Sequence, residues 1–370
     1  MNRVVDFFVR ESLLVILLLL LVIISIMEPG HVHKFHQWVE WKVIATLIGL
    51  MVLTAGLSYS GFFDVFSRRI IRFVGTERTL ALFLVLLSFF LSPVLTNDMA
   101  LFVVVPLTLA FSRGLENDIS KIVILEALAV NSGSALFPIG NPQNIYLWHR
   151  WGISFWDFAV QMLIPVSVML FLLLAFVFLL FPSRKLRLSA DTPSVGFDAR
   201  LFILSALLMP IFVFLVDRGL SIPASAVVIS IYLIFFRYVL LRVDWLLVVL
   251  FILIFMDFGA LAHSRLVHHS ISPLIENSSE TGVYITSILL SQFISNVPAA
   301  VFLSHFFQNW KILAYGVNVG GNGTVIASLA SIIALRLGKV RRGWLLFHVY
   351  SIPFLIMSAI GIYVLIIRGF

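Results

Sequence analysis

The chain has 370 residues, of which 61% are hydrophobic and 12% are charged, and its mean hydropathy is +1.08. A soluble domain has about a quarter of its residues charged, so this composition excludes a soluble globular protein and predicts one embedded in lipid. The chain has no cysteine, which excludes disulfides, thiol catalysis and Cys-ligated metal sites. The net charge of +7 gives no support to nucleic-acid binding, because its distribution follows the membrane.

Nine apolar segments are long enough to cross a bilayer, which takes about 20 helical residues. The first segment follows Arg3 and Arg10, as in a signal peptide, but it leads into Glu28-Pro29-Gly30 rather than a cleavage site. We therefore expect an uncleaved first span. In chain order the predicted spans are 11–27, 41–60, 122–147, 156–181, 200–216, 222–240, 244–262, 311–335 and 343–367.

Two further apolar segments, 79–111 and 283–307, are each interrupted near the middle by polar, turn-prone residues. The interruptions are SPVLTND at 92–98 and SQFISNVP at 291–298, and the second segment is too short to cross twice. Non-helical backbone is tolerated at membrane depth only where protein or a watery cavity satisfies it. These segments therefore predict two re-entrant hairpins whose tips lie inside the protein.

The basic residues support this arrangement of spans. With a cytoplasmic N-terminus and each hairpin returning to its own side, 18 of the 25 Lys and Arg residues lie in the cytoplasm. This bias obeys the positive-inside rule, and the eight Trp residues fall near span ends, as in an aromatic belt. We predict an all-α polytopic protein of the cell membrane with its N-terminus cytoplasmic and its C-terminus outside.

The predicted elements form two matching series joined by the span 200–216. Four spans, with a hairpin after the second, are followed by the joining span and then by four spans with a hairpin again after the second. A single joining span makes the second series enter from the opposite face, which predicts an inverted-topology repeat of the kind found in secondary transporters. The units are 1–181, with hairpin 79–111 and broken helix 122–147; a linker at 182–221; and 222–370, with hairpin 283–307 and broken helix 311–335.

Each series contains a hairpin tip and a helix interrupted by glycine and asparagine. A half-helix that begins at mid-membrane presents unpaired N–H groups and the positive end of its dipole to an anion, whereas unwound carbonyls suit Na⁺. We predict that the solute and its coupling ion bind here. The predicted binding residues are Thr96, Asn97, Asp98, Asn131, Gly133, Ser134, Asn141 and Asn144 in the first series, and Ser295, Asn296, Asn318, Gly320, Gly321, Asn322 and Thr324 in the second.

Acidic residues inside the membrane are costly and usually functional. Asp98 is predicted to bind a proton or Na⁺, or to cap the helix that follows it. Asp257 either joins a coupling path, pairs with a neighbouring helix or reaches headgroup water, and Glu126 is predicted to be a solvated or paired residue at a span boundary. We expect no cofactor and no metal besides Na⁺ at the hairpin tips.

Four motifs, TNDMALFVVVPLTLAF, GSALFPIGNPQN, SNVPAAVFL and GVNVGGNGTVIAS, resemble the ion transporter superfamily over nearly the whole chain. Its branches include citrate and divalent-anion symporters, arsenite permeases and D-type sodium/proton antiporters. The resemblance implies a scaffold, a moving transport domain and often a homodimer that works as an elevator, with Asn97 and Asn296 as tip asparagines around solute and ion. The Asn97-Asp98 pair is similar to the arsenite-permease branch and the GNPQN run to the citrate branch.

We therefore predict a secondary active transporter that moves a small anion, either a carboxylate or an inorganic oxyanion, coupled to H⁺ or Na⁺. The alternative is a Na⁺/H⁺ antiporter in which Asp98 carries both ions in turn. An intramembrane enzyme is disfavoured, because the chain has no His-Glu-x-x-His sequence and no nucleophile with a supporting partner pattern. No G-x-x-x-x-G-K-S/T loop occurs, so this chain is not expected to bind ATP.

Overall fold

The computed structural model describes residues 12–71, 74–111, 119–186, 196–265, 267, 278–340 and 342–369. The loops at 112–118 and 187–195, which hold part of the predicted cytoplasmic charge, lie outside these residues, as do Arg3 and Arg10. The described chain is helical, in the order α2 (Ser12–Met27), η1 (Pro29–Lys34), α3 (Phe35–Trp38), α4 (Trp41–Tyr59), α5 (Phe62–Ile71), α6 (Glu77–Leu95), α7 (Asn97–Phe111), α8 (Ser120–Ser134), α9 (Pro142–Trp151), α10 (Phe155–Leu180), α11 (Ala199–Asp217), α12 (Ser221–Phe235), α13 (Arg237–Leu240), α14 (Trp245–Ala262), α17 (Glu280–Ile294), α18 (Asn296–Leu303), α19 (Trp310–Gly320), η3 (Val325–Ala327), α20 (Leu329–Leu337), α21 (Gly343–Leu365) and η4 (Ile367–Gly369).

Among the described residues, six helices are long and apolar enough to cross a bilayer: α4, α6, α10, α11, α14 and α21. Five of them coincide with predicted spans, whereas α6 is the first leg of a predicted hairpin. Helix α2 reaches the required length only together with η1 and α3, which bend away from it by 119°. Helix α12 is apolar but has 15 residues. The prediction of an all-helical, multi-pass membrane protein is confirmed at this level.

Both predicted hairpins fold as two helices separated by a single residue. Thr96 separates α6 from α7 with φ 71° and ψ 153°, and Ser295 separates α17 from α18 with φ 73° and ψ 156°. A residue with a side chain rarely adopts this conformation, which costs about 1–3 kcal/mol. The two legs of each hairpin pack against each other. The same unusual backbone therefore occurs at both tips.

The two predicted broken helices are also interrupted. Residues 135–141 separate α8 from α9, and residues 321–328, which include η3, separate α19 from α20. The first break is compact because a Cβ on Gly140 would lie 2.1 Å from the carbonyl oxygen of Ser134. Close approach of backbone to backbone thus requires glycine at this position.

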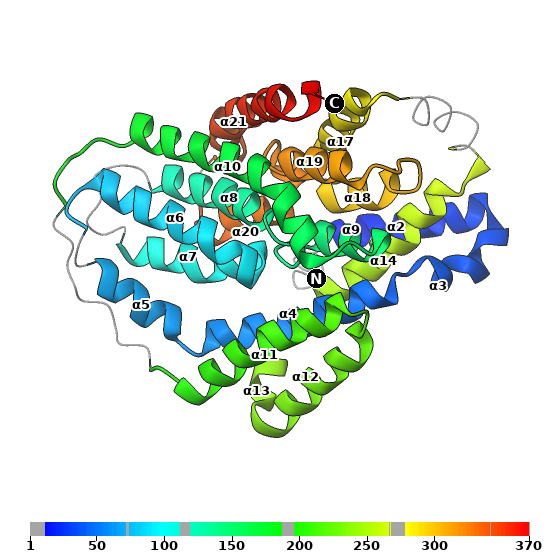
Figure 1. The fold of residues 1–370 in the computed structure, drawn as a ribbon, viewed down its shortest axis with the longest axis horizontal. Helices are drawn as coiled ribbons and strands as arrows, with labels where there is room; N and C mark the ends of the chain where they lie inside the picture. Colours follow the sequence, from blue (N-terminus) through cyan, green and yellow to red (C-terminus); the bar gives the residue numbers. More distant parts are fainter. Residues whose placement is uncertain are drawn as a thin grey trace, which may run out of the picture.

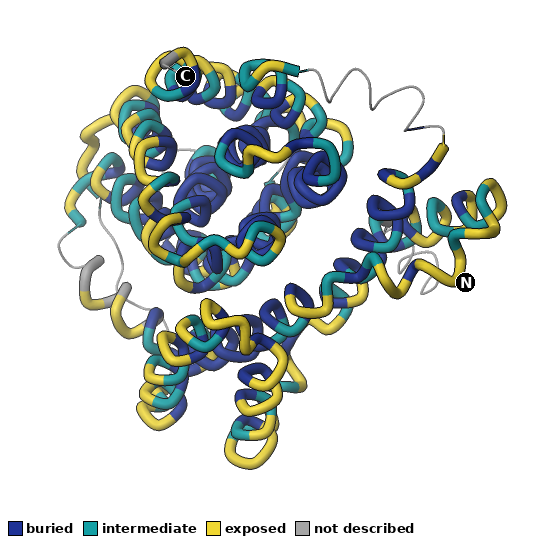
Figure 2. Tube along the Cα trace, turned by 45° about the vertical axis from the view of Figure 1, so that its right-hand side comes forward, coloured by how far each residue is buried: buried dark blue, intermediate teal, exposed yellow. Residues whose placement is uncertain are grey.

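The helices form two lobes (Figures 1 and 2). The compact lobe is a ring of helices that contains both hairpins, both broken helices, α10 and α21, while the elongated lobe is a row made of α2, α3, α4 and α11–α14. In the elongated lobe, α4 packs on α11 and α12, and α14 packs on α2. Every candidate binding residue therefore lies in the compact lobe.

The contacts of one half have counterparts in the other when the elements are matched in chain order. Helix α2 packs on α14 as α12 packs on α4, and α7 packs on α20 as α18 packs on α9. The second half-helix of each broken helix thus rests against the second leg of the other half's hairpin. These contacts between the halves bring the polar breaks of both halves close together.

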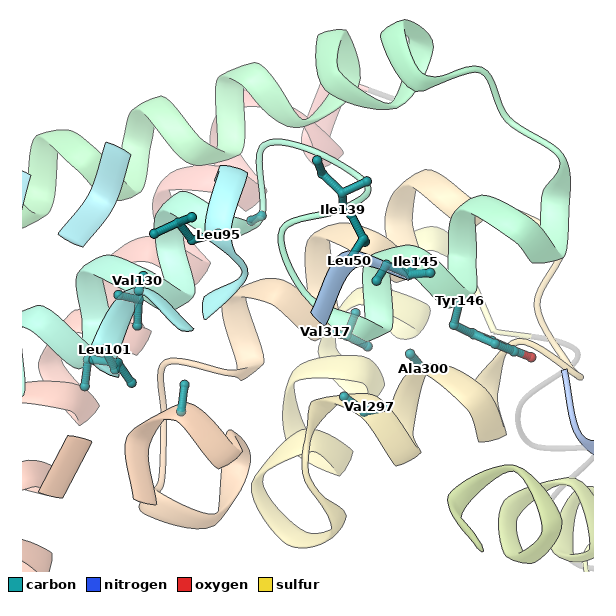
Figure 3. Packing of buried hydrophobic residues seen from close by; sticks show 14 of the residues in the cluster. Leu50, Leu95, Leu101, Val130, Ile139, Ile145, Tyr146, Val297, Ala300 and Val317 are labelled. Carbon is teal, nitrogen blue, oxygen red and sulfur yellow. The ribbon is translucent and has the colours of Figure 1, made fainter. Parts of the chain in front are cut away.

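Apolar packing surrounds these breaks and changes character at the surface. Figure 3 shows Val130 of α8, Ile145 of α9 and Val317 of α19 in the core, and all three are fully buried. On the outer face of α10, by contrast, Phe171 and Leu179 are 71% and 81% exposed. Large side chains so exposed are suited to contact with lipid tails rather than water.

Candidate functional site

A cavity of about 20 Å³, enough for one water molecule or a small cation, lies where both hairpin tips meet two half-helices. We call it the tip cavity. Its wall contains the tip residues Asn97 and Asp98 from the first half and Ser295 and Asn296 from the second. The predicted tip residues of both halves thus come together, except Thr96, which forms the break behind them.

Four helices begin at the tip cavity. Their first residues, Asn97 of α7, Pro142 of α9, Asn296 of α18 and Leu329 of α20, all line it. Helix N-termini carry unpaired N–H groups and a partial positive charge, and none of the residues that line this cavity is Lys, Arg or His. The positive partial charge at the cavity therefore comes from the backbone alone, and it lies beside the carboxyl of Asp98.

The N-termini of the two halves differ in how their N–H groups are occupied. In the first half, Asn141 caps α9 through Asn144 N, and the Asn97 side chain accepts from Asp98 N at 3.0 Å. In the second half, α18 and α20 have no side-chain cap. The second half thus offers the freer donors to an anion.

Two buried acceptor oxygens also face the tip cavity. Asp98 Oδ1 and Gln143 Oε1 have no hydrogen-bond partner within the described part of the chain, and both residues line the cavity. An unsatisfied buried acceptor costs about 1–3 kcal/mol. A proton or a Na⁺ ion bound at either oxygen would remove the cost there. Within the described ranges, no three His, Asp or Glu side chains gather as they would around a transition metal.

Beside the cavity, an asparagine of each broken helix holds the other half. Asn131 of α8 donates to Gly321 O at 3.0 Å and accepts from Ser328 Oγ at 3.0 Å. Ser328 is the N-cap residue of α20, so Asn131 fixes the start of that helix. This bond crosses from the first half to the second.

The reverse bond starts from Asn318 of α19. Its Nδ2 donates to Asn144 Oδ1 at 2.7 Å, and its Oδ1 accepts from Asn141 Nδ2 at 3.0 Å. Asn141 is the N-cap residue of α9. Asn318 thus does for α9 what Asn131 does for α20, and the two bonds are reciprocal.

The chain matches the family profile described as "Citrate transporter" (CitMHS) over residues 7–309. It belongs to the citrate transporter family. It is 40% identical over 329 residues to the inner membrane protein YbiR of Escherichia coli, covering 89% of this chain and 88% of that protein. It is 38% identical over 330 residues to the uncharacterized transporter MJ0456 of Methanocaldococcus jannaschii, covering 87% and 86%. The uncharacterized transporter Mb2703 of Mycobacterium bovis is 22% identical over 352 residues, covering 81% and 79%.

Membership of the citrate transporter family confirms the resemblance to the ion transporter superfamily and supports a secondary transporter. In this family member the predicted site residues divide into two groups. Asn97, Asp98, Ser295 and Asn296 line the tip cavity, whereas six other polar residues form the hydrogen-bonded network around it: Asn131, Ser134, Asn141, Asn144, Asn318 and Asn322.

The predicted glycines allow close packing rather than contact with the cavity. A Cβ on Gly133 would lie 2.1 Å from Phe89 O, one on Gly320 would lie 2.8 Å from Ser291 Cβ, and one on Gly321 would lie 2.6 Å from Asn296 Nδ2. Thr324 lies away from the cavity, where its hydroxyl donates to Gln292 O at 3.1 Å.

Three polar residues of the site are not among the predicted ones. Gln143 and Ser328 line the tip cavity, and Gln292 fixes the second break by donating to Gly320 O at 2.9 Å and accepting from Thr324 N at 2.8 Å. Each lies within a polar run or at a helix start that is visible in the sequence. The signal is therefore position relative to a break, which residue type alone does not reveal.

Besides Asp98, the two acidic residues that the sequence analysis places inside or near the membrane, Glu126 and Asp257, are buried in this citrate transporter family member. Glu126 is completely buried and its Oε1 accepts from Thr108 Oγ1 of α7, so it is paired, and the alternative of a solvated boundary residue is wrong. Asp257 is also completely buried, and neither of its carboxyl oxygens has a partner among the described residues. It therefore neither reaches headgroup water nor pairs with a described neighbour.

Proposed function

We propose that this citrate transporter family member carries a small anion, a carboxylate or an inorganic oxyanion, together with H⁺ or Na⁺. The observation that carries the proposal is the convergence of four helix N-termini on one buried cavity. Positive charge that comes from backbone dipoles holds an anion without the tight pairing that a buried Lys or Arg would bring. A carrier must also release its solute, which this weaker attraction allows.

The coupling ion occupies the first tip in this proposal. Asp98 Oδ1 and Gln143 Oε1 supply oxygen ligands, which suit both Na⁺ and a proton. An ion there reduces the repulsion between the Asp98 carboxylate and an incoming anion. The same carboxyl supports the second candidate, a Na⁺/H⁺ antiporter in which the acid binds the two cations in turn and no anion moves.

The motion in this proposal is elevator-like. The compact lobe, a transport domain with two re-entrant hairpins, moves against the elongated lobe, which stays in the membrane as the scaffold of a homodimer. The reciprocal bonds of Asn131 and Asn318, together with the exchanged contacts of α9 and α20, support an inverted-topology repeat of units 1–181 and 222–370 around the linker 182–221. The N-terminus is cytoplasmic and the C-terminus outside.

Transport by purified protein in proteoliposomes tests the proposal. Labelled citrate, dicarboxylates, sulfate, phosphate and arsenite are offered one at a time, each with an imposed Na⁺ or H⁺ gradient. We expect one class of anion to accumulate, and to do so with only one of the two gradients. Cation exchange without uptake of any anion would instead establish the antiporter.

A further inference from the structure

Two pairs of helices that occupy equivalent places in the halves can be aligned residue by residue. Helices α4 and α14 both begin at the Trp of a Val-acid-Trp motif, at 39–41 and 243–245. This alignment makes Thr46 equivalent to Leu250 and Val43 equivalent to Leu247. Each of these helices belongs to the elongated lobe and faces the compact lobe.

In the compact lobe, α9 packs on α4, and its counterpart α20 lies across a cavity from α14, which itself packs on α18. Both α9 and α20 begin directly after an N-cap residue, Asn141 and Ser328, that the other half's asparagine holds. With these starts aligned, His149 is equivalent to Arg336. The two ends of the interface between the lobes can therefore be compared at the same positions.

At the first end the lobes are bound together. Helix α4 packs on α9, and Thr46 Oγ1 lies 2.8 Å from His149 Nε2. The Thr46 hydroxyl donates its proton to Lys42 O at 2.8 Å, so it accepts from an Nε2–H of His149. A second bond between the lobes, from Phe155 N to Asp217 Oδ1 at 2.8 Å, lies at an apolar cavity of about 610 Å³ between α10 and α11, so the Thr46–His149 contact is the one that closes this end.

At the second end α14 and α20 are separated by a cavity of about 290 Å³. Leu247, Leu250 and Ile333 line its wall, the exposed Asp244 and Arg336 are among its lining residues, and the start of α2 and Phe102 of α7 complete it. We call it the side cavity. It adjoins the tip cavity, because Leu13 and Leu329 line both.

We propose that this is a one-sided state, in which the tip cavity is reached between α14 and α20 and is sealed between α4 and α9 by the Thr46–His149 hydrogen bond. The inference rests on the proposed transport function. It adds the route by which the tip cavity is reached and the Thr46–His149 hydrogen bond that closes the other route, which we call the latch. With the predicted orientation the open route faces the cytoplasm. In the opposite state the lobes part at Thr46 and His149 and meet at Leu250 and Arg336.

The absence of cysteine makes the routes directly measurable, since every introduced thiol is unique. Leu247→Cys places a thiol in the open route, and Val43→Cys places one at the equivalent point of the sealed route. Both are labelled in proteoliposomes with a water-soluble maleimide. We expect Leu247→Cys to react at least about tenfold faster, as a predominantly one-sided population requires. Equal rates at both positions, or no reaction at Leu247→Cys because lipid tails fill the side cavity, would overturn the proposal.

The latch is tested by adding Thr46→Val to each cysteine variant, since valine keeps the shape and removes the acceptor. Losing one hydrogen bond should raise labelling at Val43→Cys about fivefold and lower it at Leu247→Cys. Thr46→Ser, which keeps the hydroxyl, should match the parent. Unchanged rates with Thr46→Val would remove the latch. No solute is present in this assay, so a failure of anion uptake leaves its result intact, and a failure here leaves the uptake result intact.

Discussion

The two hairpin tips have nearly the same backbone and different side chains. Thr96 and Ser295 break their helices at φ values of 71° and 73°, and an asparagine follows each. The next residue is Asp98 at the first tip and Val297 at the second. Backbone geometry, which can serve an anion, is therefore shared by the halves, whereas the carboxyl, which can serve a cation, belongs to one.

This difference assigns anion binding to one tip and cation binding to the other, two functions that would otherwise conflict in one small cavity. The uncapped N-termini of α18 and α20 leave the second half electropositive, while Asp98 and Gln143 make the first half rich in acceptors. The tip cavity holds only one small ion as it stands, so an anion and a cation would lie side by side, each stabilising the other, only once the cavity has widened. If this division is correct, changes at the two tips should have different effects on solute and ion.

The largest effect is expected when the shared part of the tips is removed. Asn97→Ala and Asn296→Ala should each reduce transport below detection, because each asparagine provides the polar side chain at a helix start that lines the tip cavity. Initial rates of anion uptake in proteoliposomes measure this. Size-exclusion profiles like that of the parent must accompany the loss, and parent-like rates in both variants would remove the proposed site.

The unshared part is tested by Asp98→Asn, which keeps the shape and removes the charge. Loss of a charge-assisted interaction with the coupling ion should lower gradient-driven uptake by about 10–100-fold. Exchange of labelled for unlabelled anion at equal ion concentrations should fall much less. The matched change, Val297→Asn, should leave the ion dependence unaltered. An equal loss of driven uptake and exchange in Asp98→Asn would show that the acid acts on the anion itself.

A smaller effect, on stability, is expected from glycines at equivalent positions. Gly133→Ala places a Cβ 2.1 Å from the rigid backbone oxygen of Phe89, whereas Gly320→Ala places one 2.8 Å from the Ser291 side chain. Overpacking of this kind costs about 1–3 kcal/mol, and we expect Gly133→Ala to lie at the upper end. Thermal unfolding in detergent should therefore show the lower midpoint for Gly133→Ala; the reverse order would contradict the packing described for α6 and α8.

The sequence predicts the architecture better than it predicts the roles of single residues. Both breaks and both tips are visible in it, because clusters of proline, glycine and asparagine interrupt apolar segments at a depth where the backbone must find its partners inside the protein. Asn131 and Asn141 are expected in the cavity, yet they bind the other half. Their partners, Ser328 and Asn318, are more than 170 residues away, and no local pattern encodes that distance.

Burial is also harder to predict than position along the chain. The sequence places Glu126 near a span boundary because it lies about one turn inside the end of the predicted span, but α7 packs on α8 there, Thr108 binds its carboxyl and the residue is completely buried. Span counting gives depth along one helix and contains no information about which neighbours surround it. Gln143 is not predicted for the same reason. Its position becomes part of a cavity only because the second tip packs next to it.

The last comparison concerns the two N-cap residues that the network holds, Ser328 and Asn141, and Ser328→Ala has the smallest expected effect of all. Ser328→Ala removes one hydrogen bond to Asn131, whereas Asn141→Ala removes the bonds to Asn318, to Ser134 and to Asn144 N. A single buried hydrogen bond is worth about 1 kcal/mol, so Ser328→Ala should lower the midpoint of thermal unfolding slightly and Asn141→Ala clearly more. Ser328 also lines the tip cavity and Asn141 does not, so Ser328→Ala should change the concentration of anion at half-maximal uptake more than Asn141→Ala does. If Asn141→Ala has the larger effect on stability and Ser328→Ala the larger effect on anion affinity, the residues that line the cavity are distinct from the network that holds them. If one variant has the larger effect on both, the division of the site into lining residues and network is wrong.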